Sequence, residues 1–414
     1  MIVWLNWIAI CLFLVLTVIL VGVTISAGSF PVMQTLGAPG RGVKMEVVRQ
    51  NFPPMAPLWW DNYEGAYMIS LFVGKGLVEL VLDSGCSQLS VKGEGCQWKN
   101  CTELGCAIMS CPCGFENGQS RKQCKEWFYQ PSGQPIDRSG KLNELKYGSQ
   151  TNRVQYYQDE VFVPITSKTM TCDTVMRTPD LREIPQFRDK VRVGEILVHR
   201  VSHIEGASNS NLLGCSKPKA GKNDVLDNLL PKKIWSVVLY KRGGWLALGR
   251  MPCFQPEYIT MIEPPSLMSF VTRFYILPIF SISIGPDELS LHKLPSFPKY
   301  CIIDTGTTST YASKTFGAAL ANGGFKEGPN GSCMEIQLGS TSNHVRLFYS
   351  RTALMDPEYP AESIIQAWQG RTLDDFDEIF PDDNQQHGVL LFGAIMMQDH
   401  YWEFDLQKNR IGIS

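Results

Sequence analysis

Two aspartates occur in matching surroundings at distant positions in the chain. The stretches VELVLDSGCSQLSV (residues 78–91) and KYCIIDTGTTSTYA (residues 299–312) each place an apolar pair before Asp, then a hydroxyl residue, then Gly. The two aspartates are Asp83 and Asp304. A carboxyl group accepts a proton when ionised and donates one when protonated, so two carboxyls that meet can act as general base and general acid.

Contact between these carboxyls would determine their chemistry. Both cannot ionise easily at close range, so they share a proton, and the apparent pKa values belong to the pair. The ionised member can activate a water molecule while the protonated member polarises a peptide carbonyl, with no covalent intermediate. The sequence therefore predicts hydrolysis by Asp83 and Asp304 that uses no cofactor and no metal ion.

Each aspartate needs a strand and a tight turn to present its carboxyl group. The apolar residues before it are typical of a buried strand, and Gly85 and Gly306 let the backbone turn where a Cβ would clash. Ser84 and Thr305 can then form hydrogen bonds between the two turns.

A second pair of segments strengthens the repeat. Leu212-Leu213-Gly214 follows the first aspartate motif, and Leu391-Phe392-Gly393 follows the second. One Asp-Ser-Gly or Asp-Thr-Gly alone is an ordinary turn. Two copies, each with its own later apolar-apolar-Gly, indicate two similar lobes that face each other.

Composition favours a mainly β protein of this size. The chain has 414 residues, 44% hydrophobic and 19% charged, with 36 Gly and 25 Pro, and several runs alternate as strands do. The 38 basic and 40 acidic residues give a formal charge of -2, which argues against nucleic-acid binding. No Gly-x-Ser-x-Gly or His-Glu-x-x-His motif is present, so a serine hydrolase or a zincin is a poor fit.

The N-terminal region is expected to direct the chain to a membrane or to secretion. Residues 3–25 carry no charge and are long enough to span a bilayer. We assign residues 1–27 as a transmembrane signal anchor or a cleaved signal peptide, with the anchor favoured, and residues 28–64 as a stalk or short pro-segment.

Cysteine usage points to an oxidising compartment. Twelve of the 13 cysteines follow the apolar segment, and seven of these lie between Cys86 and Cys124. A zinc module is the weaker interpretation, because no Cys-x-x-Cys pair and no interleaved His occur there. Asn100 and Asn330 begin glycosylation sequons. We therefore expect the secretory pathway, with the catalytic part luminal or extracellular and membrane-anchored, or secreted.

Over nearly all of residues 65–414 the sequence resembles the pepsin family of aspartic peptidases. Beyond the two aspartate motifs, GAYMISLFVG is similar to the opening strand of the family and LLFGAIMMQDHYWEFDLQKNRIGIS to its closing segment. The resemblance implies a bilobal fold with two pseudo-symmetric β-rich lobes. They would be an N-terminal lobe at residues 65–250, with a Cys-rich insert at about 96–124 similar to nepenthesin-like members, and a C-terminal lobe at residues 251–414.

The resemblance also assigns roles. It implies that Asp83 and Asp304 are catalytic and that Tyr147 and Gly148, in Lys-Tyr-Gly-Ser, belong to a flap that closes over the substrate. It places a small disulfide between Cys96 and Cys101, and a polypeptide substrate extended over about seven residues in the cleft of a monomer. Dyad support is implied for a set of turn residues: Ser84, Gly85, Thr305, Gly306 and Thr307.

Two departures keep an alternative function open. Cys86 stands where the family usually has a serine that hydrogen-bonds the first catalytic carboxylate, and Ser90 where it commonly has a tryptophan that supports the flap. A thiol is a poor hydrogen-bond donor, so it stabilises the ionised form of the first carboxyl weakly. The first carboxyl should then contribute more to the raised pKa of the pair, unless Cys86 is in a disulfide. The alternative is a catalytically inactive relative that acts as a binding or receptor module.

Overall fold

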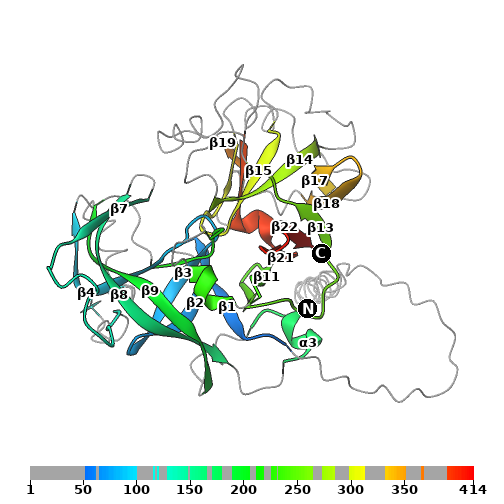
Figure 1. Cartoon of the computed structure of the whole chain (residues 1–414). Helices are drawn as coiled ribbons and strands as arrows, with labels where there is room; N and C mark the ends of the chain where they lie inside the picture. The colour runs from blue at the N-terminus through cyan, green and yellow to red at the C-terminus, as the bar shows by residue number, and fades with distance from the viewer. Residues whose placement is uncertain are drawn as a thin grey trace, which may run out of the picture. The chain divides into compact units, whose positions relative to one another are not determined.

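The computed structural model confirms a mainly β protein (Figure 1). Within the described residues, thirteen strands form one sheet and seven form another, and a two-stranded sheet is separate. We call the first two the large sheet and the small sheet. The structure describes residues 52–61, 65–99, 115–116, 119–120, 128–147, 150–165, 170–179, 189–205, 211–218, 225–230, 232–263, 273–284, 298–312, 332–350, 365–367 and 389–414.

Neighbouring strands in each sheet are often distant in the chain. In spatial order, the large sheet runs β13 (Glu257–Thr260), β22 (Arg410–Ile413), β21 (Tyr401–Asp405), β11 (Ile234–Tyr240), β12 (Gly243–Ala247), β1 (Met55–Asp61), β2 (Ala66–Val73), β3 (Gly76–Asp83), β10 (Leu212–Gly214), β4 (Leu89–Lys99), β9 (Asp189–Glu205), β8 (Gln150–Ile165) and β7 (Asn143–Tyr147). The small sheet runs β18 (Asn343–Ser350), β17 (Ser332–Ser340), β14 (Tyr275–Ile284), β15 (Tyr300–Asp304), β20 (Val389–Gly393), β16 (Thr310–Ala312) and β19 (Ile365–Ala367). The remaining elements are β5 (Phe115–Glu116), β6 (Gln119–Ser120), the short helices α3 (Cys172–Val175) and α4 (Val225–Leu229), and the 3-10 helix η6 (Ala394–Met397).

The internal repeat of the sequence is a repeated arrangement of strands. In the large sheet β3 pairs in parallel with β10, so that Asp83 lies opposite Gly214. In the small sheet β15 pairs in parallel with β20, so that Asp304 lies opposite Gly393. A further strand pairs antiparallel with each Gly-ending strand, β4 in one sheet and β16 in the other. Each motif therefore ends a buried central strand at equivalent points of two similar units.

The large sheet contains strands from both sides of the predicted domain boundaries. Strand β1 lies in the expected stalk or pro-segment, yet residues 55–58 are buried and the strand pairs with β2 and β12. Strands β13, β21 and β22 follow residue 251 but belong to the large sheet, where β21 pairs with β11. The physical reason is burial, because an apolar strand such as Tyr401–Asp405 is stable only when both its faces are covered.

Aromatic packing and hydrogen bonds connect strands of the large sheet to the small sheet. Trp235 of β11 stacks on Phe404 of β21 with ring centroids 3.9 Å apart, and both side chains are fully buried. The Trp235 indole N–H donates to the Tyr275 hydroxyl of β14 over 3.1 Å. That hydroxyl donates to the Cys215 carbonyl over 2.5 Å. This chain of contacts connects the large sheet to the small sheet beneath the aspartate turns.

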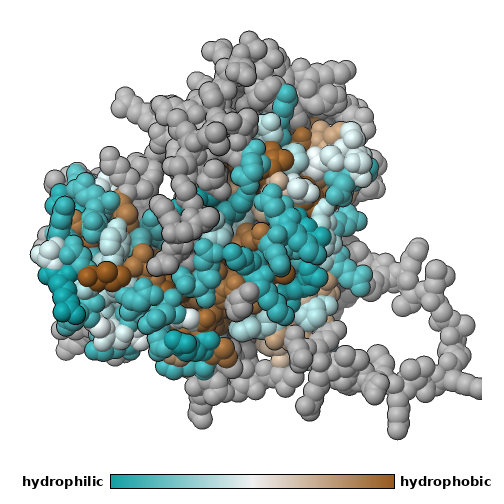
Figure 2. Space-filling view, in the orientation of Figure 1, coloured by the Kyte–Doolittle hydropathy of each residue, from teal (hydrophilic) through white to brown (hydrophobic). Residues whose placement is uncertain are grey.

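The surface of the described residues is mixed in polarity. On the face shown in Figure 2, hydrophobic residues appear in scattered groups among hydrophilic ones. The large hydrophobic side chains that are exposed among the described residues are Ile136, Met176, Phe280 and Phe348, and the last two lie on β14 and β18 of the small sheet. None of the helices in the described part of the chain has the length and apolar content needed to cross a bilayer.

One disulfide is formed within the described residues. Cys172 of α3 bonds to Cys253, 81 positions further on, with Cα atoms 5.3 Å apart. Cys96 is not bonded to any described cysteine, and its pairing with Cys101 stays a prediction. Cys101 lies outside the described residues. The spacing of cysteines alone cannot identify partners, since pairing depends on which strands the fold brings together.

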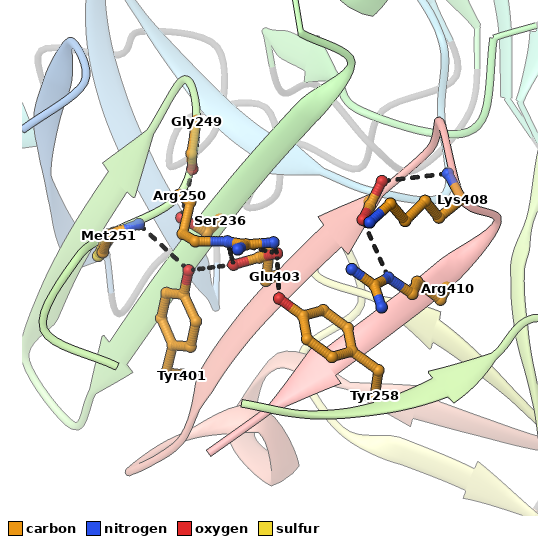
Figure 3. Close-up of polar contacts among 10 residues, drawn as sticks. Ser236, Gly249, Arg250, Met251, Tyr258, Tyr401, Glu403, Lys408 and Arg410 are labelled. Atoms are coloured by element: carbon orange, nitrogen blue, oxygen red, sulfur yellow. Dashed lines mark hydrogen bonds and ion pairs between the residues drawn. The ribbon is translucent and has the colours of Figure 1, made fainter. Parts of the chain in front are cut away.

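A buried glutamate on β21 binds donors from three other residues (Figure 3). The side chain of Glu403 on β21 is fully buried and receives two guanidinium N–H groups of Arg250, at 2.8 and 2.9 Å. The hydroxyls of Tyr258 and Tyr401 donate to the same carboxylate at 2.8 and 2.9 Å. Alongside it, Arg410 pairs with Asp405 and lies over the Tyr258 ring. A carboxylate with four such donors is well compensated for the loss of water.

We expect Glu403→Gln to lower the free energy of unfolding by about 3 kcal/mol. The substitution removes the negative charge beside Arg250, and the amide N–H₂ group, which cannot accept hydrogen bonds, would face donors. Urea unfolding at pH 7 measures the change. The control is Glu335→Gln, which removes a carboxylate 3.6 Å from Arg346 in a more exposed pair and should cost less than about 1 kcal/mol. Equal losses for the two variants would contradict this interpretation.

Candidate active site

Four hydrogen bonds lock the two aspartate turns together. The Ser84 N–H donates to the Thr305 hydroxyl oxygen, and the Thr305 N–H donates to the Ser84 hydroxyl oxygen, each over 2.9 Å. Each hydroxyl then donates into the opposite strand, from Thr305 to the Leu82 carbonyl (2.7 Å) and from Ser84 to the Ile303 carbonyl (3.0 Å). Both side chains are fully buried. The predicted contact between the turns is therefore present, and it is symmetrical.

The glycines of the two turns make room for the opposite carboxyl group. A Cβ on Gly306 would lie 2.5 Å from Asp83 Cγ, and a Cβ on Gly85 would lie 2.9 Å from Asp304 Oδ1. Contacts below 3.0 Å are not tolerated by real Cβ atoms. The sequence suggested glycine for the turn itself, whereas the structure shows that close approach of the partner aspartate requires it.

The carboxyl groups also contact each other and their own turns. The Gly85 N–H donates to Asp83 Oδ1 (2.8 Å) and the Gly306 N–H donates to Asp304 Oδ1 (2.9 Å). Burial raises the pKa of Asp83 well above its usual range, and the charge of Asp304 and a hydrogen bond between the two carboxyls raise it further. The backbone N–H groups of Gly85 and Cys86 act in the opposite direction. The pair has the features of two carboxyls that share a proton.

The residues after the two glycines differ in what they donate. The Thr307 hydroxyl donates to Asp304 Oδ2 over 2.7 Å. Cys86, at the equivalent place, is a free cysteine whose Sγ accepts the Gln88 N–H at 3.4 Å. Burial, together with the charge of Asp83, raises the pKa of this thiol, so it is protonated at neutral pH. The expected asymmetry between Cys86 and Thr307 is therefore visible in the hydrogen bonds.

Two residues near the first turn escaped the sequence analysis. The N–H of Cys215, which follows the Leu-Leu-Gly segment, donates to the Asp83 carbonyl over 2.6 Å, and its side chain is buried. The Arg273 guanidinium contacts the Ser87 hydroxyl, and its charge acts to lower the pKa of Cys86. Cys215 could have been suspected because it directly follows a repeated motif. No local pattern marks Arg273, which precedes β14 in the other sheet.

The predicted flap corresponds to a hairpin. Strands β7 and β8 pair antiparallel up to Tyr147 opposite Gln150, which leaves two residues, Gly148 and Ser149, to connect them. The Tyr147 side chain and Gly148 lie outside the described residues. The structure therefore supplies the hairpin but does not place either residue over the aspartates.

Ser90, the second departure, lies beside a buried histidine. Ser90 of β4 is opposite His199 of β9, and both are buried. Ser90 Oγ and His199 Nδ1 have no hydrogen-bond partner among the described residues. The ring of Tyr156 packs edge-on against His199 with centroids 4.9 Å apart. Burial lowers the pKa of His199 to about 4.

This histidine should make folding sensitive to acid. The unfolded chain binds a proton at His199 near pH 6.5, while the folded chain does so only near pH 4. Stability is therefore present above pH 6.5 and is lost as the pH falls toward 4, by about 3 kcal/mol for this residue. We expect His199→Gln to reduce the difference in urea-unfolding free energy between pH 7 and pH 4 by about that amount. An unchanged difference would show that His199 does not titrate on unfolding.

Several predictions concern residues that the structure does not describe. They are the N-terminal segment at residues 1–27, the sequons at Asn100 and Asn330, and most of the Cys-rich insert. Across the described ranges, no group of three or more His, Cys, Asp or Glu side chains is arranged to hold a metal ion.

Comparison with known protein families finds no family model that matches the chain, and comparison with curated proteins finds no significant match.

Proposed function

We propose that this chain is a pepsin-like aspartic endopeptidase with two lobes that meet at Asp83 and Asp304. The observation that carries the proposal is the reciprocal pair of hydrogen bonds between Ser84 and Thr305, which holds each carboxyl against the glycine of the opposite turn. A structural turn would need no such symmetry. The raised pKa of Asp83 beside a second carboxyl supports a dyad that keeps one proton.

The proposed reaction is hydrolysis of a peptide bond by water. The ionised carboxylate takes a proton from water as its oxygen attacks the scissile carbonyl carbon, and the protonated carboxyl donates a hydrogen bond to the carbonyl oxygen. A tetrahedral intermediate results. It collapses when the leaving nitrogen receives a proton and the C–N bond breaks, which returns the dyad to its singly protonated state.

The substrate is proposed to be an extended polypeptide between the dyad and the β7–β8 hairpin. In this role Tyr147 and Gly148 form the tip of the flap, and main-chain hydrogen bonds hold the peptide as an added strand. We further propose a monomer in the secretory pathway, secreted or held at a membrane by residues 1–27. Asn100 and Asn330 are the candidate glycosylation sites.

Cys86 favours a second candidate, an inactive binding module of the same fold. Without a hydroxyl at this position, Asp83 lacks the side-chain donor that Asp304 receives from Thr307. A peptide-binding cleft with an impaired dyad would then remain.

The test is peptide cleavage by purified residues 28–414 between pH 3 and 7. A quenched peptide library supplies the substrate, and pepstatin, a transition-state mimic, is the inhibitor. Cleavage that pepstatin blocks is the expected result. Folded protein that binds library peptides without cleaving them at any pH would favour the binding module, and protein that does neither would rule out both candidates.

A further inference from the structure

The hydrogen bonds around the dyad are unequal. Asp304 receives the Gly306 N–H on Oδ1 and the Thr307 hydroxyl on Oδ2, at 2.9 and 2.7 Å. Asp83 receives the Gly85 N–H on Oδ1 at 2.8 Å and a weaker contribution from the Cys86 N–H. A short hydroxyl donor stabilises the ionised form of a carboxyl, so Asp304 is the better place for the negative charge.

The surroundings of Asp83 reinforce the difference. The thiols of Cys86 and Cys215 lie near it, and each has its pKa raised by burial and by the charge of Asp83. Protonated thiols are weak donors and stabilise an adjacent carboxylate poorly. Arg273 contacts the Ser87 hydroxyl, and its charge acts on the pKa of Cys86. Among the described residues, the titratable groups whose pKa values are coupled to the charge of Asp83 thus include Asp304 and the two thiols.

We propose that the shared proton resides on Asp83, that Asp304 is the ionised general base, and that Cys86 sets this order as a positioning residue. The inference rests on the proposed function, because it assigns the two roles of that mechanism. Asp304 then takes the proton from water, and Asp83 donates its hydrogen bond to the scissile carbonyl. The residue after each glycine therefore determines which aspartate holds the proton, and it does so without contacting the substrate.

The position of the shared proton can be found without measuring peptide cleavage. Two reagents are used, one that reacts with ionised carboxylates and one that reacts with protonated carboxyls. An epoxide such as 1,2-epoxy-3-(4-nitrophenoxy)propane reacts with an ionised carboxylate: the carboxylate oxygen bonds to a ring carbon, the ring C–O bond breaks, and the alkoxide takes a proton from solvent. A diazoacetyl ester reacts with a protonated carboxyl, which transfers its proton to the diazo carbon, and N₂ leaves as the carboxylate oxygen bonds to that carbon. Mass spectrometry of proteolytic peptides locates each ester.

We expect the epoxide on Asp304 and the diazo reagent on Asp83, each with at least about a tenfold preference over the other aspartate. Cys86→Ser supplies a hydroxyl donor to Asp83 and should reduce or reverse both preferences. Cys86→Ala is the matched control, because it removes the thiol without adding a donor and should leave both preferences as in the unmodified chain. Because Cys86→Ala has no thiol at this position, a label found on the same peptide cannot come from alkylation of Cys86.

The outcomes separate this proposal from the proposed function. Epoxide on Asp83 in the unmodified chain, the same pattern in Cys86→Ser, or no ester on either aspartate would each overturn the assignment. Labelling as expected in a chain that cleaves no peptide would keep the proton order and reject the peptidase. In an active chain, Cys86→Ser should also move the acidic limb of the kcat/KM profile to lower pH, because the dyad then loses its first proton more easily.

Discussion

Asp83→Asn and Asp304→Asn are each expected to lower kcat/KM for peptide cleavage by at least about 10³-fold. An amide can neither take a proton from water nor keep the shared proton, so either change removes one half of the acid–base pair. Because the two residues act as one unit, the double variant should be little worse than either single variant. Initial rates with a quenched peptide measure the effect.

The asparagine variants should remain folded, which separates catalysis from stability. Asparagine has nearly the shape of aspartate, and the buried carboxyl of Asp83 is itself costly to ionise beside Asp304. We expect urea midpoints at pH 7 no lower than that of the unmodified chain. A folded variant that retained more than about a tenth of the activity would show that the carboxyl is not part of the acid–base pair.

Gly306→Ala is expected to lower kcat/KM by about 10²-fold, because displacement of a reacting group by about 1 Å has effects of this size. The new Cβ would lie 2.5 Å from Asp83 Cγ and 2.6 Å from its Oδ1, so the carboxyl or the turn must move. Some stability should also be lost, by about 1–3 kcal/mol. Rates and urea unfolding at one pH report both effects.

A matched control for this variant lies on the strand that carries Asp83. A Cβ on Gly76 of β3 would have no atom within 4 Å, and Gly76 is not among the glycines with positive φ. Gly76→Ala should therefore leave kcat/KM within about twofold and stability within about 0.5 kcal/mol. Similar losses in both variants would indicate that the carboxyl is not held against Gly306.

The sequence was sufficient to predict the turns because their chemistry is local and repeated. Each motif consists of an apolar pair, an aspartate, a hydroxyl residue and a glycine. This order predicts a strand that ends in a turn that presents a carboxyl group, and the second copy predicts an equivalent turn elsewhere in the fold. The contact of Ser84 with Thr305 could thus be predicted 221 positions apart. The unequal donors, Cys86 and Thr307, were also readable from residue types alone.

The features that the sequence analysis missed depend on long-range packing. Arg273 reaches Ser87 across 186 positions, and Cys172 bonds to Cys253 across 81, and no motif marks Arg273 or either cysteine. The place of β21 in the large sheet was not predicted either, because an apolar strand does not reveal which sheet it will complete. Pairing of distant strands depends on the shapes of both partners, and one segment carries only half of that information.

The position of β21 between β22 and β11 in the large sheet has a consequence for the order of folding. Strand β11 pairs with β12 on one side and with β21 on the other, and the second partner lies more than 160 positions later in the chain. During synthesis, a ribosome that has completed β11 still has that distance to translate, at about 5–20 residues per second. For this interval of several seconds or more β11 has an open edge, and the nascent chain needs a chaperone or rapid burial there to avoid aggregation.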